Sequence, residues 1–292
     1  MLLHKVRLLK SLGITNVASI VSDRLLRRRS PAYIRWAKQF EGNGLEIGGP
    51  SKVFSRGGYW PVYERARCID NVNFSDRTEW HGALPSGSCF HFSERKAPGI
   101  QFICDAGDLH DVEDQAYDFI VSSHMLEHSA NPMRVLNEWK RVLKVRGLLH
   151  LVLPHRDGTF DHRRPVTRIE HLWDDFARGT TEADQSHFDE ILSLHDLSRD
   201  LSQASSDSFR SWILDNVNTR GAHHHVFTSF LAAQLLDAVG FELLAIEPRR
   251  PYDIFVTARN PESWNDALNS AILSTGAAYL MRSPFPSDRG AT

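Results

Sequence analysis

The stretch Gly44-Leu45-Glu46-Ile47-Gly48-Gly49-Pro50-Ser51 decides the fold of this chain. Its apolar first half predicts a short buried strand, and its two adjacent glycines predict a turn at which the backbone can approach a ligand closely. Asp70 follows about twenty residues later, at the end of the next expected strand. A glycine turn followed by a carboxylate one strand over is typical of doubly wound sheets that bind a nucleoside, where the carboxylate accepts hydrogen bonds from ribose hydroxyls.

The turn departs from the fingerprint of dinucleotide-binding proteins. It lacks the Gly-x-Gly-x-x-Gly spacing, and Pro50 stands where a helix that binds phosphate would present an N–H group. A pyrophosphate needs such amides. The sequence therefore favours a nucleoside ligand without phosphate, and a dehydrogenase is the weaker interpretation.

Apolar runs alternate with helical patterns from about residue 44 to 155. Runs rich in Ile, Val, Leu and Phe predict parallel strands that are buried on both faces. The clearest helix is Asn131–Lys144, with Asn131 as N-cap, Pro132 in its first turn and Gly147 ending it. The pattern predicts an α/β protein with a doubly wound, mostly parallel sheet. The expected strands are Gly44–Gly48, Arg67–Asp70, Gln101–Cys104, Tyr117–Ser122, Leu148–Leu153, Phe241–Ile246 and Asp253–Ala258.

The composition is that of an ordinary globular protein, with 292 residues, of which 41% are hydrophobic and 24% charged. The 3 cysteines follow no metal-binding spacing, which fits a reducing compartment and argues against a disulfide or zinc framework. We find no apolar run long enough to cross a membrane and no features of a secretory signal. We therefore expect a cytoplasmic protein.

Three parts of the chain are expected. Residues 1–40 form a basic helical segment, residues 41–262 the main domain, and residues 263–292 a C-terminal helix and tail that is disordered from about 284. The first part holds nine lysines and arginines and a single acid, Asp23. This pattern fits a helix that packs on its own domain, which we favour, or one that lies against the inner face of a membrane.

The polar, histidine-rich residues 155–225 interrupt the main domain after its fifth strand. A plain connection of this length is uncommon. Apolar residues such as Trp173 and Ile213 predict an ordered insertion that covers the substrate, with short helices around Val166–Phe176 and Phe188–Asp200, rather than a disordered loop.

Two further motifs follow in order. They are Cys104-Asp105-Ala106-Gly107-Asp108 and the run Tyr117-Asp118-Phe119-Ile120-Val121-Ser122-Ser123-His124-Met125-Leu126-Glu127-His128. With the glycine turn and Asp70 they resemble class I S-adenosylmethionine-dependent methyltransferases, in the branch of bacterial glycan and small-molecule enzymes. The resemblance spans about residues 44–155. It implies a Rossmann-like methyltransferase fold with a seven-stranded sheet, and S-adenosyl-L-methionine as cofactor.

The resemblance also implies roles for individual residues. Glu46, Gly48 and Gly49 would face the methionine part and the sulfonium, and Asp70 with its neighbour Asn71 would hold the ribose. Asp105 and the Ala106 amide would read adenine, while Ser123 and His124 would lie beside the methionine moiety. Glu46 and Asp105 can also be read as residues that only stabilise turns.

The acceptor chemistry is inferred from histidines, which titrate near neutral pH and suit removal of a proton from a hydroxyl. His155 directly follows the fifth strand and is the expected base, with Asp157 orienting it. His128 and His224 are the alternatives. We therefore expect O-methylation. The mixture of cations, histidines and an aromatic platform favours a sugar or oligosaccharide, bound by His162, Arg163, Arg164, Trp173, His223 and His225.

Several alternatives stay open at this point. The acceptor can be another small molecule or a lipid-linked compound, and the chain can be a non-catalytic scaffold that docks on a membrane. No nucleic-acid partner is expected, because the main domain is acidic. The histidines match no compact metal motif, so a divalent metal is an open alternative that we do not predict. The sequence predicts no oligomeric state.

Overall fold

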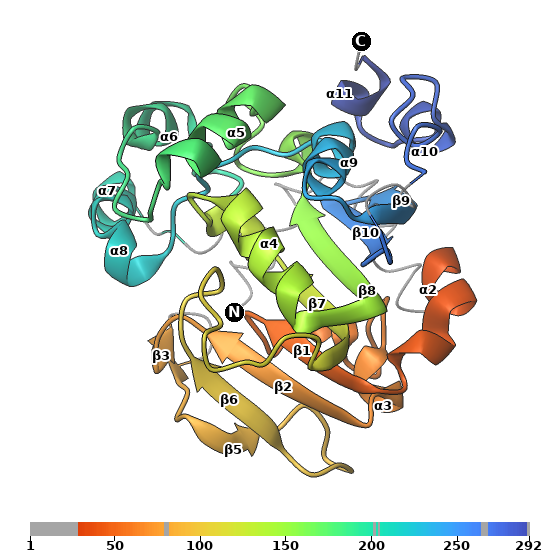
Figure 1. Cartoon of the computed structure of the whole chain (residues 1–292). Coiled ribbons are helices and arrows are strands. Elements are labelled where there is room, and N and C mark those ends of the chain that lie inside the picture. The colour runs from red at the N-terminus through yellow and green to blue at the C-terminus, as the bar shows by residue number, and fades with distance from the viewer. Residues whose placement is uncertain (1–28, 79–81, 201–202, 204, 264–267, 291–292) are drawn as a thin grey trace.

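The computed structural model describes residues 29–78, 82–200, 203, 205–263 and 268–290. Within this part of the chain, eight strands form one sheet in the order β5-β6-β2-β1-β7-β8-β10-β9 (Figure 1). The strands are β1 (Asn43–Ile47), β2 (Cys68–Asn73), β5 (Gly87–Phe90), β6 (Gly99–Ile103), β7 (Tyr117–Ser123), β8 (Leu143–Pro154), β9 (Glu242–Arg249) and β10 (Asp253–Arg259), with a separate hairpin of β3 (Arg77–Thr78) and β4 (Gly82–Ala83).

The centre of the sheet is parallel. β1 pairs with β2 and β7, and β6 and β8 continue the parallel part on either side. β10 runs antiparallel to both β8 and β9. The predicted doubly wound, mostly parallel sheet is confirmed, but it has eight strands rather than seven. The extra strand is β5, which pairs antiparallel with β6 at the sheet edge and is largely exposed, so its residues show no apolar run.

Side chains alternate between two hydrophobic layers along the strands, as the pleat of a strand requires. Ile120 of β7 packs with the layer that includes α4 (Pro132–Val142) and α9 (Ser229–Ala238). Its neighbours Phe119 and Val121 pack on the opposite layer. That layer is aromatic and includes residues from α2 (Pro31–Trp36), η1 (Ala37–Phe40), η2 (Lys52–Phe54) and α3 (Val62–Arg65).

Helix α4 follows the predicted pattern. The Asn131 side chain accepts a hydrogen bond from the Arg134 N–H, and Pro132 begins the helix. Its buried face includes Leu136, Trp139 and Val142. The helix ends at Val142 rather than near Gly147, because β8 starts immediately at Leu143 and Gly147 lies inside that strand.

The insertion is ordered over its described residues. It forms η4 (Arg156–Gly158), α5 (Ile169–Arg178), α6 (Phe188–Leu194), α7 (Ser206–Leu214) and α8 (Asn216–Thr219). Figure 1 shows α5 to α8 grouped together on one side of the molecule. They have a small core of their own, which includes Phe188, Phe209 and Ile213. The alternative of a disordered loop is therefore wrong for the described part of 155–225.

The C-terminal segment was expected to be disordered from about 284, and this was wrong for the residues described up to Gly290. Helices α10 (Ala278–Met281) and α11 (Pro286–Arg289) pack against the domain. Asp288 is buried there and accepts hydrogen bonds from the backbone N–H and the hydroxyl of Ser229. Because a buried carboxylate needs such donors, these hydrogen bonds fix the segment in place. The sequence pattern of the segment does not reveal them.

Most of the basic segment 1–40 lies outside the described residues, including Asp23 and the apolar positions on which its helix prediction rested. Its described end is packed on the domain, where Ser30 and the Ala32 N–H bond to the Glu247 carboxylate. In the described part of the chain, no helix combines the length and apolarity needed to cross a membrane.

Candidate active site

The glycine turn stands at the carboxyl end of β1, in the middle of the parallel sheet. Gly48 has a φ of +81°, which L side chains rarely adopt, and its N–H donates to the Val72 carbonyl at 2.8 Å. The Gly49 N–H donates to Oδ1 of Asn71 at 3.0 Å. The Gly49 carbonyl in turn accepts from the Asn71 and Asn73 amides. The turn is therefore held in place by β2, and its positive φ at Gly48 suits a residue without a side chain.

Glu46 lies beneath this turn rather than in a site that a ligand can reach. Its side chain is fully buried, and a Cβ atom on Gly49 would lie 2.3 Å from the Glu46 carboxyl carbon. Burial raises the pKa of Glu46 to about 7, although hydrogen bonds from Tyr63 and Ser51 favour the carboxylate. The prediction that Glu46 binds the methionine ammonium does not fit this geometry. Asn71 is likewise buried and engaged with the turn.

Asp70 lies in the first half of β2, opposite Leu45, because β2 continues to Asn73. The expected strand end at Asp70 was therefore wrong by three residues, or about 10 Å of extended chain. Its carboxylate accepts hydrogen bonds from the Ile100 N–H at 2.7 Å and the Tyr117 hydroxyl at 2.8 Å. The prediction that Asp70 binds ribose does not fit this position, since Asn73 is the polar residue at the strand end.

Asp105 follows β6 at the edge of the sheet where a nucleoside was expected. Its side chain is 35% exposed, and Oδ1 accepts a hydrogen bond from the Gly107 N–H at 2.8 Å. Ala106 follows directly, and its carbonyl accepts from the Trp139 indole. Their role in binding adenine stays a prediction.

Arg220 from the insertion reaches across this same edge, and sequence reasoning did not find it. It pairs with Asp105 at 3.2 Å and with Glu182 at 3.0 Å. Its guanidinium lies 5.2 Å from the ring centroid of Phe74, which follows β2. Arg220 has a φ of +51°, a backbone feature with no signal in the sequence. The insertion thus contacts the expected nucleoside edge directly.

The carboxyl end of β7 brings Ser123 and His124 beside the glycine turn. Met125 is the link, since a Cβ atom on Gly48 would lie 3.2 Å from the Met125 Cγ atom. His124 pairs with Asp253 at 3.0 Å and with Glu127 at 3.6 Å. Burial opposes a charged ring, but these two carboxylates raise the pKa of His124 to about 10. His124 is therefore a cation at neutral pH and no general base.

Glu127, His128 and His223 form a cluster just beyond this end of β7, with ligand atoms within 4.8 Å of one another. The rings of His128 and His223 have their centroids 4.6 Å apart. Asp161 accepts a hydrogen bond from Nδ1 of His223 at 2.6 Å, which orients that ring. Burial, and then His223, lower the pKa of His128 to about 4. The His128 imidazole is therefore neutral at pH 7.

Comparison with known proteins agrees with this geometry. Residues 88–151 match the family model described as a methyltransferase domain. These residues span β6, β7, α4 and most of β8, which carry Asp105 and the segment His124–His128. The sheet is mostly parallel, as the resemblance implied, and β10 runs antiparallel to its neighbours. Residues 88–151 thus match a methyltransferase domain, and the sheet with its flanking helices has the Rossmann-like methyltransferase fold.

Solved structures of such methyltransferases are similar over most of the chain. One from Aquifex aeolicus is 11% identical, with a TM-score of 0.41 over 80% of this chain and 91% of that one. One from Mesorhizobium loti is 15% identical, with a TM-score of 0.45 over 78% and 96%. The 1,6-didemethyltoxoflavin-N1-methyltransferase of Burkholderia thailandensis is 15% identical, with a TM-score of 0.41 over 84% and 77%. No curated protein matches the chain.

The His155 side chain contacts the C-terminal segment rather than the residues of the candidate site. The ring is fully buried, Nε2 lies 3.0 Å from Asp288, and Nδ1 accepts from the Asp157 N–H at 3.1 Å. Asp157 itself accepts hydrogen bonds from the Ser287 N–H and hydroxyl. The pair predicted as base and orienter therefore holds the C-terminal segment, and the assignment needs correction.

His224 is also unsuited to act as base. It is buried in the insertion, and its Nε2 atom lies 3.0 Å from the Asn216 amide, so the ring is engaged there. It packs near Phe188 in the core of the insertion.

The residues predicted to bind substrate do not converge on one place. Arg164 is buried and bonds to Asp161, Glu190 and the His223 carbonyl. His162 and Arg163 both pair with Asp196. Trp173 is 46% exposed on α5, and His225 is buried next to Asp175. Of the set, His223 is the one that lies in the cluster with His128.

Proposed function

We propose that this methyltransferase domain acts on a hydroxyl group of a small molecule and that His128 accepts the hydroxyl proton. The observation that carries the proposal is the half-buried imidazole of His128, close to the carboxyl end of β7. That end adjoins the glycine turn through Met125 and Gly48. Ligands of doubly wound sheets bind at this edge.

The residues at this edge fit S-adenosylmethionine, which supplies an electrophilic methyl group when bound. The glycine turn and Ser123 would lie beside the methionine part. The half-exposed carboxylate of Asp105 and the Ala106 backbone would hold the adenine. The fit rests on the place of the turn and of Ser123 at the carboxyl ends of β1 and β7, and on the exposure of the Asp105 carboxylate.

An oxygen acceptor is favoured by the charges around His128. A hydroxyl must lose its proton as its oxygen bonds to the methyl carbon and the sulfur–carbon bond breaks. His128 is unprotonated at neutral pH, and because burial makes its imidazole a weak base, it takes that proton with the help of the nearby Glu127 carboxylate. Burial raises the pKa of Glu127, but its histidine neighbours hold it below its usual value, so a carboxylate stands ready to stabilise the imidazolium. An amine acceptor needs this arrangement less.

A sugar or oligosaccharide is our leading acceptor class. Its support is the composition of the insertion, which offers histidines, arginines and the exposed aromatic ring of Trp173. Other small molecules and lipid-linked compounds are the alternatives. Each of these compounds carries a hydroxyl group whose proton the same base can accept.

The test is calorimetry with S-adenosylhomocysteine, followed by assays of methyl transfer to panels of sugars, nucleotide sugars and phenols. We expect micromolar binding and transfer to at least one hydroxyl compound. His128→Ala should lower kcat about 100-fold or more while the affinity for S-adenosylhomocysteine stays unchanged. His110→Ala changes an exposed side chain and is the matched control. Absence of binding at millimolar ligand would overturn the proposal, and transfer to amines alone would overturn its acceptor.

A further inference from the structure

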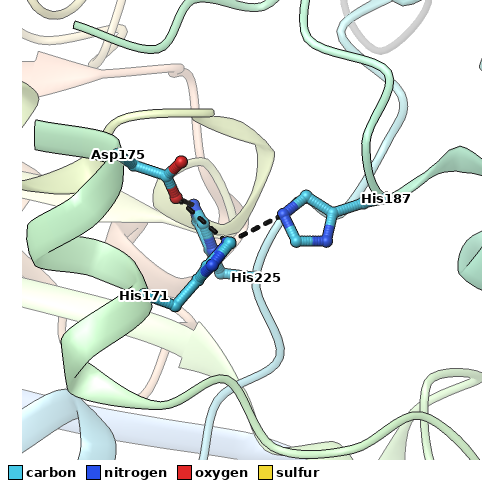
Figure 2. Close-up of side chains that lie close together, drawn as sticks. All are labelled: His171, Asp175, His187 and His225. Carbon is cyan, nitrogen blue, oxygen red and sulfur yellow. Dashed lines mark hydrogen bonds and ion pairs between the residues drawn. The ribbon is translucent and has the colours of Figure 1, made fainter. Parts of the chain in front are cut away.

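Four side chains of the insertion converge on one point, and none of them belongs to the His128 cluster. His171 and Asp175 are one turn apart on α5 and so share a helix face. His187 comes from the connection before α6, and His225 from the connection before α9. Figure 2 shows the rings of His171 and His187 pointing toward each other and the Asp175 carboxylate facing them. Three separate segments of chain therefore supply one cluster.

The spacing of the four groups is that of metal ligands. Each offers one ligand atom, and these atoms all lie within 4.8 Å of one another. The Nε2 atoms of His171 and His187 are 3.0 Å apart, and Oδ2 of Asp175 lies 3.2 Å from His171 and 3.7 Å from His225. Four tetrahedral ligands, each about 2 Å from a zinc ion, are about 3.3 Å apart. The measured separations bracket that value.

Hydrogen bonding alone does not account for the arrangement. The Asp175 side chain is only 7% exposed, and its Oδ2 atom accepts no hydrogen bond. A buried carboxylate oxygen without a donor is costly. His171 uses the same Nε2 atom toward both His187 and Asp175, and that atom carries at most one hydrogen. A cation at the centre would satisfy all of these atoms at once.

The surroundings support the ligands as they do in known metal sites, where hydrogen bonds fix the orientation of each ligand. The Thr180 hydroxyl donates to Oδ1 of Asp175 at 3.0 Å, which turns Oδ2 toward the histidines. The His171 side chain is 32% exposed, which leaves a route for an ion to enter.

We propose that His171, Asp175, His187 and His225 bind one zinc ion in a four-coordinate structural site. Three imidazoles and one carboxylate suit zinc or a similar transition metal, whereas magnesium and calcium prefer oxygen ligands alone. The ion ties α5 and the connection before α6 to the chain that enters α9. It also anchors the start of α4, since Asn131 bonds to the Asp175 carbonyl. This site is separate from the proposed methyl transfer, and its failure would leave that proposal intact.

The experiment measures metal in the full chain, produced without a histidine tag. Mass spectrometry of the purified protein should find about one zinc per chain. Protein stripped with a chelator should bind one Zn²⁺ or Co²⁺ in calorimetry, and the Co²⁺ form should show the intense visible bands of a tetrahedral site. His171→Ala and Asp175→Asn should abolish stoichiometric binding. Thr180→Val should weaken it about 10- to 100-fold, as loss of a hydrogen bond to a ligand does elsewhere.

The controls separate this site from others in the chain. His110→Ala removes an exposed histidine and should keep the metal. His171 is partly exposed, so its variant should fold, and circular dichroism checks this. A chelator should lower the melting temperature of the wild type and leave that of His171→Ala unchanged. No uptake of Zn²⁺ by the wild type overturns the inference. So does a metal that His171→Ala retains and His223→Ala loses, since that ion belongs to the His128 cluster.

Discussion

The Tyr63 hydroxyl donates a hydrogen bond to Oε2 of Glu46 at 2.6 Å, directly beneath the glycine turn. The Ser51 N–H donates to Oε1 of the same carboxylate at 2.9 Å. Because burial raises the pKa of Glu46 to about 7, this residue takes up a proton inside the folded protein under mildly acidic conditions. Glu46 therefore supports the turn and does not present a charge to a ligand.

The stability of the domain should depend on pH through Glu46. The unfolded chain loses the Glu46 proton near pH 4.5, but the folded protein keeps it up to about 7. Since one pKa unit corresponds to about 1.4 kcal/mol, this residue lowers the free energy of unfolding by about 3 kcal/mol as pH rises between those values, with no further change above them. Urea unfolding of wild type and Glu46→Gln from pH 5 to 8 measures this.

In that comparison the Glu46→Gln protein should gain stability relative to wild type as pH rises. Glu113→Gln changes an exposed acid and should keep the wild-type dependence on pH. Parallel curves for wild type and Glu46→Gln would show that the carboxyl group is ionised at all these pH values.

His124 should remain protonated across the physiological range. Its ion pairs with Asp253 and Glu127 raise its pKa to about 10, against the effect of burial. The stabilisation that follows is fully present below the unfolded pKa of 6.5 and is lost as pH rises through about 10. Nuclear magnetic resonance should find the His124 ring signals unchanged between pH 6 and 8.5. Asp253→Asn should bring the titration down toward that window, and a wild-type midpoint near 6.5 would contradict the assignment.

Arg220→Ala should tighten the binding of S-adenosylhomocysteine. The guanidinium pairs with Asp105 at 3.2 Å, where we propose that adenine binds, so ligand and arginine compete for one carboxylate. The pair is partly exposed and is worth at most about 1 kcal/mol, which corresponds to about 2- to 5-fold in affinity. Calorimetry on wild type, Arg220→Ala and Asp105→Ala measures this. Weaker binding by Arg220→Ala would mean that Arg220 itself contacts the cofactor.

Asp288→Ala should destabilise the whole domain, although Asp288 lies in the short C-terminal helix α11. Its buried carboxylate pairs with His155 and accepts hydrogen bonds from Ser229 and Ser283. Breaking a buried pair by removing one partner costs about 3–5 kcal/mol. Chemical unfolding should show this loss, while Arg282→Ala, an exposed change nearby, should have little effect. A stability close to wild type would mean that the segment is not held through Asp288.

The parts of the fold that the sequence predicted are those with local signals. Asn131 and Pro132 mark the start of α4 correctly because capping depends on a few adjacent residues. The apolar strands were found because burial on both faces leaves a continuous apolar run. β5 was missed since it is an exposed edge strand with no such run.

The candidate site was predictable in its position and less so in its residues. The glycine turn and the run from Ser123 to His128 lie together, as their order along the sheet implied. Asp70 was misplaced because β2 extends three residues further, and strand ends carry little signal when the next residues are Asn, Val and Asn. His155 was misassigned because its partner Asp288 is 133 residues away.

The sequence by itself determined the class of this protein. The class was indicated by a buried strand with a glycine turn, followed by further strands with acidic ends. These features depend on the conformational preferences of a few neighbouring residues, so they are visible in the sequence. Only the tertiary structure decided the charge and the role of each titratable side chain. Whether a histidine is a base, a cation, a core residue or a proposed metal ligand depends on burial and on partners from distant segments.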